Sequence, residues 1–499
     1  MNRRTLYQAT ALVALSLATA AAGCGTEPTP ALDSNTGHTS AAVTTPGLAF
    51  YPLAAPVRLL DTRPGRPATY APGVPLRSSS PYTYSAGSAV PTTAQGLVAQ
   101  VTLLNYRATI CTYDLIYRDS YCHGDTTQTD NVLYPRVDFF AAAADWTLQP
   151  GGRYVQVGSG PLRPTAELVT LPLSGTRTFS VGVESGHRLP DDPYNEGRSY
   201  DYVGTTYVDA IVDIVGYYAP AGQTGALYLH LFDTQLNLVS WCGGNCYPVP
   251  PISLNGTITG GTPVTITARG TYNRGDQSGT FTLPASARYL VGSLTARDYS
   301  AHVGSTVYTN VYPVGATRPD TGLAITDQGV ESGQYLVQLS STGAFQIAAS
   351  TPTYVSLEVA GYFSADPNDD GNGRGLLFNL FPRFQIASSG QIDETEFAVL
   401  PVRGTGLMPP EAVAFAGRLV QSAGGESAGS ALCASPSIAS YISSWGSDVL
   451  GTGYPESVDE ATFVRRIGGG GSLAVGPGSP DLTYARGTLD AAGYYTLAP

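Results

Sequence analysis

The chain has 499 residues, a formal net charge of −12 and no lysine, so that every strongly basic side chain is an arginine. The acidic balance argues against nucleic acid as a partner and against an electrostatic grip on anionic lipids. The missing lysine excludes chemistries that need its amine, including P-loop nucleotide binding, pyridoxal phosphate Schiff bases and Ser-Lys dyads.

The first residues are typical of a bacterial export signal. Arg3 and Arg4 are followed by an apolar run, 9–22, that is too short to span a bilayer. The sequence AAGC then resembles a lipobox, in which small residues admit the peptidase and the cysteine thiol takes the lipid. We therefore expect a lipoprotein signal peptide at 1–23 and lipid attachment at Cys24. The alternative is an ordinary secretory signal with a chance cysteine.

Residues 24–47 are rich in proline, threonine and serine, which predicts a flexible tether. A flexible chain of this length has an r.m.s. span of about 25 Å. Since no later stretch approaches 18 apolar residues, lipid is the membrane anchor that the sequence predicts. The localisation would be the cell surface or periplasm. In an organism with two membranes, Gly25 after the lipidated cysteine favours the outer one.

The composition predicts many short strands joined by turns, since it includes 58 glycines, 37 prolines and 32 tyrosines with only 13% charged residues. One motif occurs three times: an aliphatic residue, an acid, two variable positions, glycine and two aromatic residues. The three copies of this closing motif are Val212–Tyr218, Leu357–Phe363 and Leu489–Tyr495.

Other landmarks occur in the same order before each closing motif. A proline precedes a strand-like run in VPTTAQGLVAQV from Val90, LPASARYLVGSL from Leu283 and MPPEAVAFAGRL from Met408. Period-two alternation follows from Leu168 and from Tyr335, which favours half-buried strands. We therefore expect an all-β protein with three tandem antiparallel β-sandwich or jelly-roll-like domains. They would be repeat 1 (48–220), repeat 2 (225–364) and repeat 3 (375–499), with an acidic, glycine-rich linker at 365–374.

Repeat 1 begins with PLAAPVRLLDTRPG and closes with VDIVGYY. It thereby resembles repeat modules of secreted, often actinobacterial, cell-envelope proteins that open with RLLDTR and end with DVxGYF. The resemblance covers all of repeat 1 and fades along the chain: repeat 2 keeps Phe232-Asp233-Thr234 but has Gln235 in place of the arginine, and repeat 3 keeps the ending and the proline pair. Such modules occur alone, in tandem or beside cell-wall hydrolases, which implies an accessory role.

Asp61, Arg63 and Asp213 are three charged residues of the two motifs in repeat 1. A carboxylate and an arginine at these places could form a site, but a structural ion pair that ties the first strand to the last is the simpler interpretation. The loss of the arginine from repeat 2 agrees with a structural bridge.

Four cysteines form two local pairs, Cys111 with Cys122 and Cys242 with Cys246. In an oxidising compartment each pair predicts a disulfide that closes a short loop. The spacings are not those of a metal site. Cys433 is left over and predicts a buried free thiol, since no histidine follows it.

Two further motifs resemble known functional sequences. GESAG around Ser427 matches the G-x-S-x-G of esterases, but the last histidine is His302, so no general base follows the serine. Asp366, Asn368 and Asp370 have the alternate spacing of a calcium loop, yet the twelfth position is Leu377 rather than glutamate. A linker calcium ion and a solvated acidic linker both stay open, and no other cofactor is expected.

The sequence therefore predicts a non-catalytic cell-envelope lipoprotein that displays tandem β-modules for structural, adhesion or interaction roles. Its partners would be the membrane, through the lipid, and envelope proteins or polysaccharides. The alternative is a lipoprotein that binds glycans or the cell wall, because its many tyrosines could stack on sugars.

Overall fold

We analysed a computed structural model of the chain, which divides into two compact units, Met1–Thr45 and Pro46–Pro499. The described residues all belong to the second unit. They are 47–66, 74–78, 81–114, 119–126, 136–141, 153–156, 164–183, 199–240, 252–253, 258–273, 280–297, 306–326, 330–368, 374–392, 398–403, 408–423, 431–435, 450–451, 458–468, 470–477 and 485–499. The expected signal peptide, Cys24 and nearly all of the tether lie outside them.

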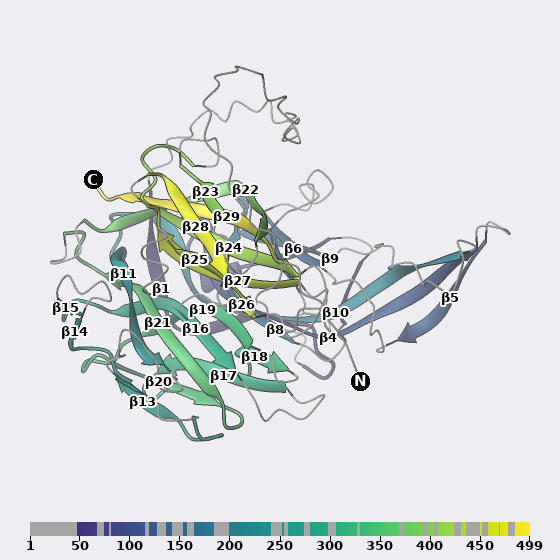
Figure 1. The fold of residues 1–499 in the computed structure, drawn as a ribbon, viewed down its shortest axis with the longest axis horizontal. Helices are drawn as coiled ribbons and strands as arrows, with labels where there is room; N and C mark the ends of the chain where they lie inside the picture. Colours follow the sequence, from purple (N-terminus) through teal and green to yellow (C-terminus); the bar gives the residue numbers. More distant parts are fainter. Residues whose placement is uncertain are drawn as a thin grey trace, which may run out of the picture. The chain divides into compact units, whose positions relative to one another are not determined.

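The predicted all-β class is confirmed, because the described residues form several antiparallel sheets and one short 3-10 helix, η1 (Gly87–Ala89) (Figure 1). Within these ranges no helix is long and apolar enough to cross a membrane.

The strands of repeat 1 form two four-stranded arrays. The first has the order β1 (Leu48–Asp61), β10 (Ser199–Pro220), β4 (Gly96–Asp114) and β8 (Thr165–Pro172). The second has the order β3 (Tyr82–Ser85), β9 (Thr178–Val183), β6 (Arg136–Phe140) and β7 (Arg153–Gln156). The short β2 (Leu76–Arg77) pairs with β10. The first and last strands of the repeat are thus neighbours.

Repeat 2 has the same strand order. Its first array is β11 (Tyr228–Ser240), β21 (Tyr354–Ser364), β16 (Tyr289–Arg297) and β19 (Val330–Gln338). Its second is β13 (Val264–Thr267), β20 (Ala344–Ala349), β17 (Thr306–Pro313) and β18 (Leu323–Thr326). β12 (Ile252–Ser253) pairs with β11, and β14 (Thr271–Asn273) pairs with β15 (Thr280–Thr282).

Repeat 3 repeats the order once more. Its first array is β22 (Leu376–Ile392), β29 (Ala485–Leu497), β24 (Ala414–Ala423) and β27 (Val458–Arg466). Its second is β23 (Ala398–Pro401), β28 (Ser472–Pro477), β25 (Ala431–Ser435) and β26 (Leu450–Gly451). Cys433 lies on β25, with its backbone opposite Gly476.

The proline landmarks form equivalent turns before the third strand of each first array. In each turn an alanine N–H donates to the carbonyl of the proline three residues earlier: Ala94 to Pro91, Ala287 to Pro284 and Ala412 to Pro409 (3.1, 3.2 and 3.1 Å). The N–H of the following residue donates to the last aromatic residue of the closing motif: Gln95 to Tyr218, Arg288 to Phe363 and Val413 to Tyr495 (2.9, 2.8 and 2.8 Å). The landmarks therefore set the register between the third and last strands.

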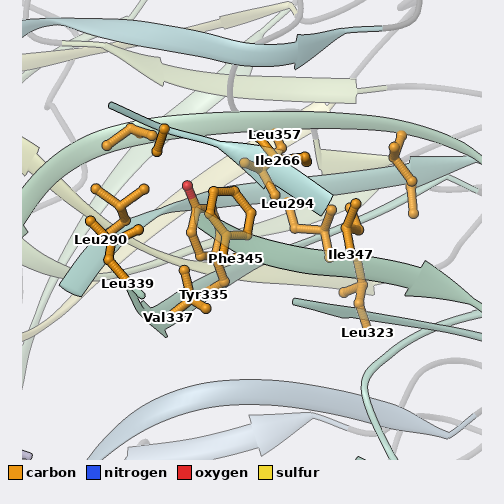
Figure 2. Packing of buried hydrophobic residues seen from close by; sticks show 14 of the residues in the cluster. Ile266, Leu290, Leu294, Leu323, Tyr335, Val337, Leu339, Phe345, Ile347 and Leu357 are labelled. Atoms are coloured by element: carbon orange, nitrogen blue, oxygen red, sulfur yellow. The ribbon is translucent and has the colours of Figure 1, made fainter. Parts of the chain in front are cut away.

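Each repeat buries a core between its two arrays. In repeat 2, Leu290 and Leu294 of β16 meet Ile266 of β13, and Phe345 and Ile347 of β20 (Figure 2). The period-two alternation of apolar residues directs these side chains to the core, because alternate residues of a strand lie on one face. A change of register by one residue would expose the whole core face.

A further core joins the repeats to one another. Its aromatic residues come from all three: Phe50 and Tyr218, Tyr289 and Phe363, Phe378 and Tyr495. The Phe50 ring lies 4.9 Å from the Phe363 ring, and the hydroxyls of Tyr218 and Tyr495 are 2.8 Å apart. The first strands also meet, since Leu48 pairs with Phe378 and Leu229 with Leu376, while Phe50 bridges to Leu227. Every repeat therefore contacts both others.

Repeat 1 differs by longer central strands. β10 has 22 residues, compared with 11 in β21 and 13 in β29. Its first part pairs with the end of β4, which pairs in turn with β5 (Asp119–Thr126), so that these three strands lie side by side (Figure 1). As predicted, Cys111 and Cys122 form a disulfide, which joins β4 to β5 at directly opposed positions. Cys242 and Cys246 lie outside the described residues.

Candidate functional site

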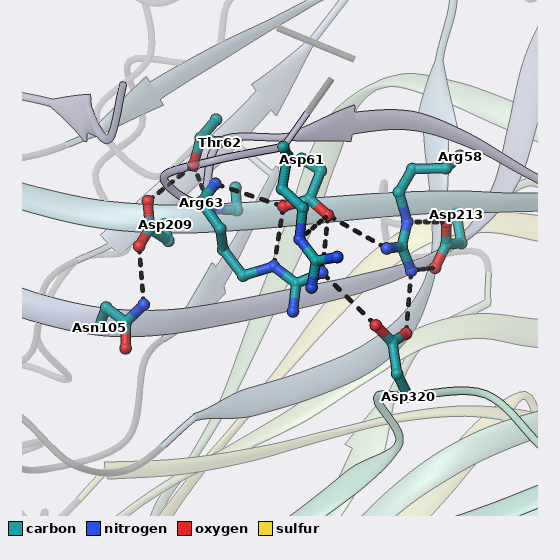
Figure 3. A network of polar contacts seen from close by, with 10 residues as sticks. Arg58, Asp61, Thr62, Arg63, Asn105, Asp209, Asp213 and Asp320 are labelled. Atoms are coloured by element: carbon teal, nitrogen blue, oxygen red, sulfur yellow. Dashed lines mark hydrogen bonds and ion pairs between the residues drawn. The ribbon is translucent and has the colours of Figure 1, made fainter. Parts of the chain in front are cut away.

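The richest cluster of charged groups in the described part of the chain surrounds the RLLDTR motif at the end of β1 (Figure 3). Arg58 lies directly opposite Asp213 in the pairing of β1 with β10. Its Nε and Nη2 atoms each donate to one carboxylate oxygen of Asp213 at 2.8 Å. This two-point contact is the strong arginine–carboxylate geometry, and it ties the first strand of repeat 1 to the last.

The next acid of the motif, Asp61, is 1% exposed and receives bonds from two arginines. Arg63 donates through Nε and Nη2 at 2.8 and 2.7 Å, and Arg58 donates through Nη1 at 3.1 Å. The backbone N–H of Arg63 adds a longer bond of 3.3 Å. The turn after β1 is thus held by hydrogen bonds from Arg63 to the buried carboxylate of Asp61.

A third acid comes from repeat 2. Asp320 accepts from Nη2 of Arg58 at 3.1 Å and lies 3.5 Å from Nη2 of Arg63 (Figure 3). Its side chain is half exposed, so this bridge is weaker than the pairs within repeat 1. The network therefore also connects repeat 1 to repeat 2.

A polar branch continues on the other side of the motif. Asp209 accepts from Thr62 Oγ1 at 3.1 Å and from Asn105 Nδ2 at 2.7 Å. Thr62 Oγ1 itself accepts from the N–H of Ala210 at 2.9 Å. Asn105 has φ of 53°, a left-handed conformation that asparagine tolerates better than most residues. The threonine of the motif thus provides the hydrogen-bond acceptor for the N–H of Ala210 in β10.

The electrostatics of the acids differ with their partners. For Asp61, burial opposes ionisation, but the bonds and charges of Arg63 and Arg58 outweigh it and lower the pKa. For Asp209, burial outweighs the bonds from Asn105 and Thr62 and raises the pKa. The hydrogen bond to Asp213 is the largest cause that raises the pKa of Arg58. The arginines therefore hold their charge at any physiological pH.

The lowered pKa of Asp61 predicts an acid-dependent loss of stability. A carboxyl with a lowered folded-state pKa stabilises the fold above its unfolded value, and this contribution is lost as pH falls through the folded value. We expect Asp61→Asn to be less stable than wild type at pH 7, and the gap to shrink as pH falls from the ordinary aspartate pKa through the lowered pKa of Asp61. Urea denaturation across this range measures the gap, and a gap that stays constant would contradict the expected role of the carboxylate.

The predicted ion pair thus has a different arrangement from the one expected. Asp61 and Arg63 contact each other, but the arginine that bonds to Asp213 is Arg58. Arg63 lies two residues beyond the end of β1, whereas Arg58 is in register with Asp213. Arg58 and Asp320 were not among the predicted site residues. The pairing of Arg58 depends on a register between β1 and β10 that includes irregularities, and nothing local to Asp320 indicates its role.

The candidate calcium loop is only partly described. Asp366 Oδ1 accepts from the N–H of Asn368 at 2.8 Å, which is a turn contact of the kind that aspartate commonly makes. Asp370 lies outside the described residues. Among the described residues no three histidine, cysteine, aspartate or glutamate side chains are grouped so that they could hold a metal ion. Ser427 and the surrounding GESAG also lie outside them.

The inter-repeat core contains a cavity of about 60 Å³. Its walls come from all three repeats and include Val98, Leu336 and Val464, with Arg418, Thr462 and Gln334 as polar members. This volume exceeds what one water molecule needs.

No protein-family model matches the chain, and no curated protein matches it. Two solved viral structures are similar over most of its length. One is the atomic structure of Sulfolobus Turreted Icosahedral Virus, with 11% identity over 79% of this chain and 91% of that chain and a TM-score of 0.14. The other describes the triple jelly roll fold and turret assembly in an archaeal virus, with 8% identity over 90% and 91% and a TM-score of 0.14. At such values the likeness carries no argument about this protein.

Proposed function

We propose that this protein is a non-catalytic, lipid-anchored envelope protein whose three jelly-roll-like β-sandwich domains display a structural, adhesion or interaction surface. The domains would be the three repeats, exported by the signal at 1–23 and held at the membrane by Cys24.

The strand order supports the jelly-roll assignment. In an eight-stranded jelly roll, two four-stranded sheets face each other, and the first strand pairs with the last. In repeat 2 the first sheet contains the first, last, third and sixth of the eight strands shared by all repeats, and the second contains the second, seventh, fourth and fifth. Repeats 1 and 3 have the same order, so one chain topology accounts for all three.

The contacts of the RLLDTR motif carry the proposal of a scaffold role. Arg58 and Arg63 each bond to carboxylates of the protein itself, and these bonds join β1 to β10 and repeat 1 to repeat 2. A catalytic or ligand-binding site usually presents such groups to a pocket. Here they stabilise the junction of strands instead.

The anchor is tested on the full-length protein expressed in a bacterium that processes lipoproteins. Mass spectrometry of the mature N-terminus should show a lipid-modified Cys24, and Cys24→Ser should move the protein from the membrane to the soluble fraction. Cleavage elsewhere, or an unmodified Cys24, would remove the anchor from the proposal.

The display role is tested separately with the mature chain. Pull-down against purified envelope polysaccharides and peptidoglycan distinguishes two outcomes. Lack of binding agrees with a structural or protein-interaction module. Saturable binding at micromolar concentrations would contradict this role and indicate a glycan-binding function.

A further inference from the structure

Repeat 3 contacts both other repeats through polar groups of one strand, β27. Thr462 Oγ1 donates to Glu167 of repeat 1 at 2.6 Å. Arg465 Nη2 donates to Ser293 Oγ of repeat 2 at 3.2 Å, and Arg466 Nη2 donates to the carbonyl of Leu231 at 2.8 Å. These contacts place the buried Arg465 and the part-buried Arg466 at the seam between repeats 2 and 3.

Glu358 is the acid of the closing motif in repeat 2, and it lies at this seam. Its side chain is 2% exposed, and it is opposite Ser293 in the pairing of β21 with β16. Arg465, which is 3% exposed, reaches the same Ser293 from repeat 3 and acts electrostatically on Glu358. Tyr335 of β19 donates to the backbone carbonyl of Glu358 at 2.8 Å. A carboxyl group is therefore enclosed between two repeats.

Among the described side chains, the strands around Glu358 bring few charges to it. β16 and β11 place Ser293 and Asn237 opposite it, and neither residue titrates. The other charged or titratable described side chains of repeat 2 on these strands are Tyr354 and Tyr362 of β21, Tyr289 of β16, Tyr228 and His230 of β11, and Tyr335 and Glu331 of β19. From the other repeats come Arg418 of β24, Arg465 and Arg466 of β27, and Glu167 of β8. Of these, Arg465 is the one that stabilises the ionised form of Glu358.

Burial and Arg465 act in opposite directions on the carboxyl. Burial is the larger cause, and it raises the pKa of Glu358 well above its usual value despite the arginine. Arg465 does not depend on an ionised Glu358 for its bonds, since its Nη1 donates to the carbonyl of Val464 at 2.8 Å and its Nη2 to Ser293. The closed seam therefore accommodates a neutral carboxyl.

We propose that the seam between repeats 2 and 3 is a pH-sensitive joint, which closes with a proton bound to the Glu358 carboxyl and loosens when that proton is released to solvent. Water reaches Glu358 when the seam opens, and the exposed carboxyl ionises at neutral pH. The closed state thus binds a proton that the open state lacks. Its stability is greatest at low pH and falls as pH rises from the unfolded towards the folded pKa.

The variant Glu358→Gln tests this joint, because its amide keeps the shape of the protonated carboxyl and cannot release a proton. Glu411→Gln, at an exposed position of repeat 3, is the matched control. Urea denaturation from pH 5 to 8.5 gives the unfolding constants of the full mature chain. We expect the ratio of the wild-type to the Glu358→Gln unfolding constant to rise by up to tenfold per pH unit, as one released proton requires. The control should follow wild type.

Hydrogen exchange locates the effect. After correction for the intrinsic pH dependence, amides of β21 and β27 in wild type should lose protection as pH rises, while those in Glu358→Gln should keep it. A constant ratio of unfolding constants would overturn the proposal. So would a Glu358→Gln protein that is less stable than wild type at every pH or fails to fold, because either result would show that the seam needs an ionised Glu358 beside Arg465.

Discussion

Gly493→Ala is expected to destabilise the protein by about 3 kcal/mol, because the new methyl group has no room. A Cβ at this position would lie 2.4 Å from the Phe378 ring and 2.4 Å from the backbone oxygen of Asn379. Phe378 belongs to the core that joins the repeats, so moving its ring would disturb contacts with Tyr218 and Tyr495 as well. The backbone oxygen belongs to β22, which is paired with β29, and it cannot move without breaking that pairing.

The control is Gly175→Ala, in the turn between β8 and β9. A Cβ there meets nothing within 4 Å, so little change in stability is expected. Urea denaturation of both variants compares their unfolding free energies with wild type. Equal values for the two variants would contradict the close approach of β22 to Gly493. The equivalent Gly216 should behave as Gly493 does, since its Cβ would meet the Phe50 ring at 2.4 Å.

Arg58→Met is expected to cost about 2–3 kcal/mol, somewhat less than a fully buried pair because Arg58 is partly exposed. The methionine keeps most of the aliphatic packing and removes the bonds to Asp213, Asp61 and Asp320. Asp61 stays buried with one bonded arginine fewer. The loss should fall at low pH, where the carboxylates become protonated.

Arg66→Met, three residues after the same motif, is the matched control. Its Nε lies 3.7 Å from Asp61, and its side chain is 43% exposed, so we expect a change of about 0.5 kcal/mol or less. Thermal and urea denaturation at pH 7 measure both variants. A loss for Arg58→Met no larger than that for Arg66→Met would show that the network contributes little to folding.

The local pattern of the sequence was sufficient to predict the strands around its landmarks. The residue that follows each turn alanine donates a backbone bond to the last aromatic residue of the closing motif, and both the alanine and the aromatic residue are visible as repeated letters. The all-β class followed from turn residues and alternation. These signals are local in the chain, which is why a single sequence carries them.

The contacts between repeats could not be predicted in this way. Asp320 sits in an exposed turn with nothing beside it to indicate that it reaches Arg58, 262 residues earlier. The tyrosine pair Tyr218 and Tyr495 depends on the packing of whole sheets. The assignment of Asp213 to Arg63 instead of Arg58 arose because the register of β1 against β10 includes irregularities that the sequence does not display.

The two ends of the described body meet the same few residues. Leu48, near the start, pairs with Phe378, and the N–H of Ala498, near the end, donates to the carbonyl of Gly375 at 2.7 Å. The start of repeat 1 and the end of repeat 3 therefore both contact the chain around the start of β22. A circular permutant that links 498 to 47 by a short glycine-serine segment and opens within 221–226 would keep every strand pairing described above.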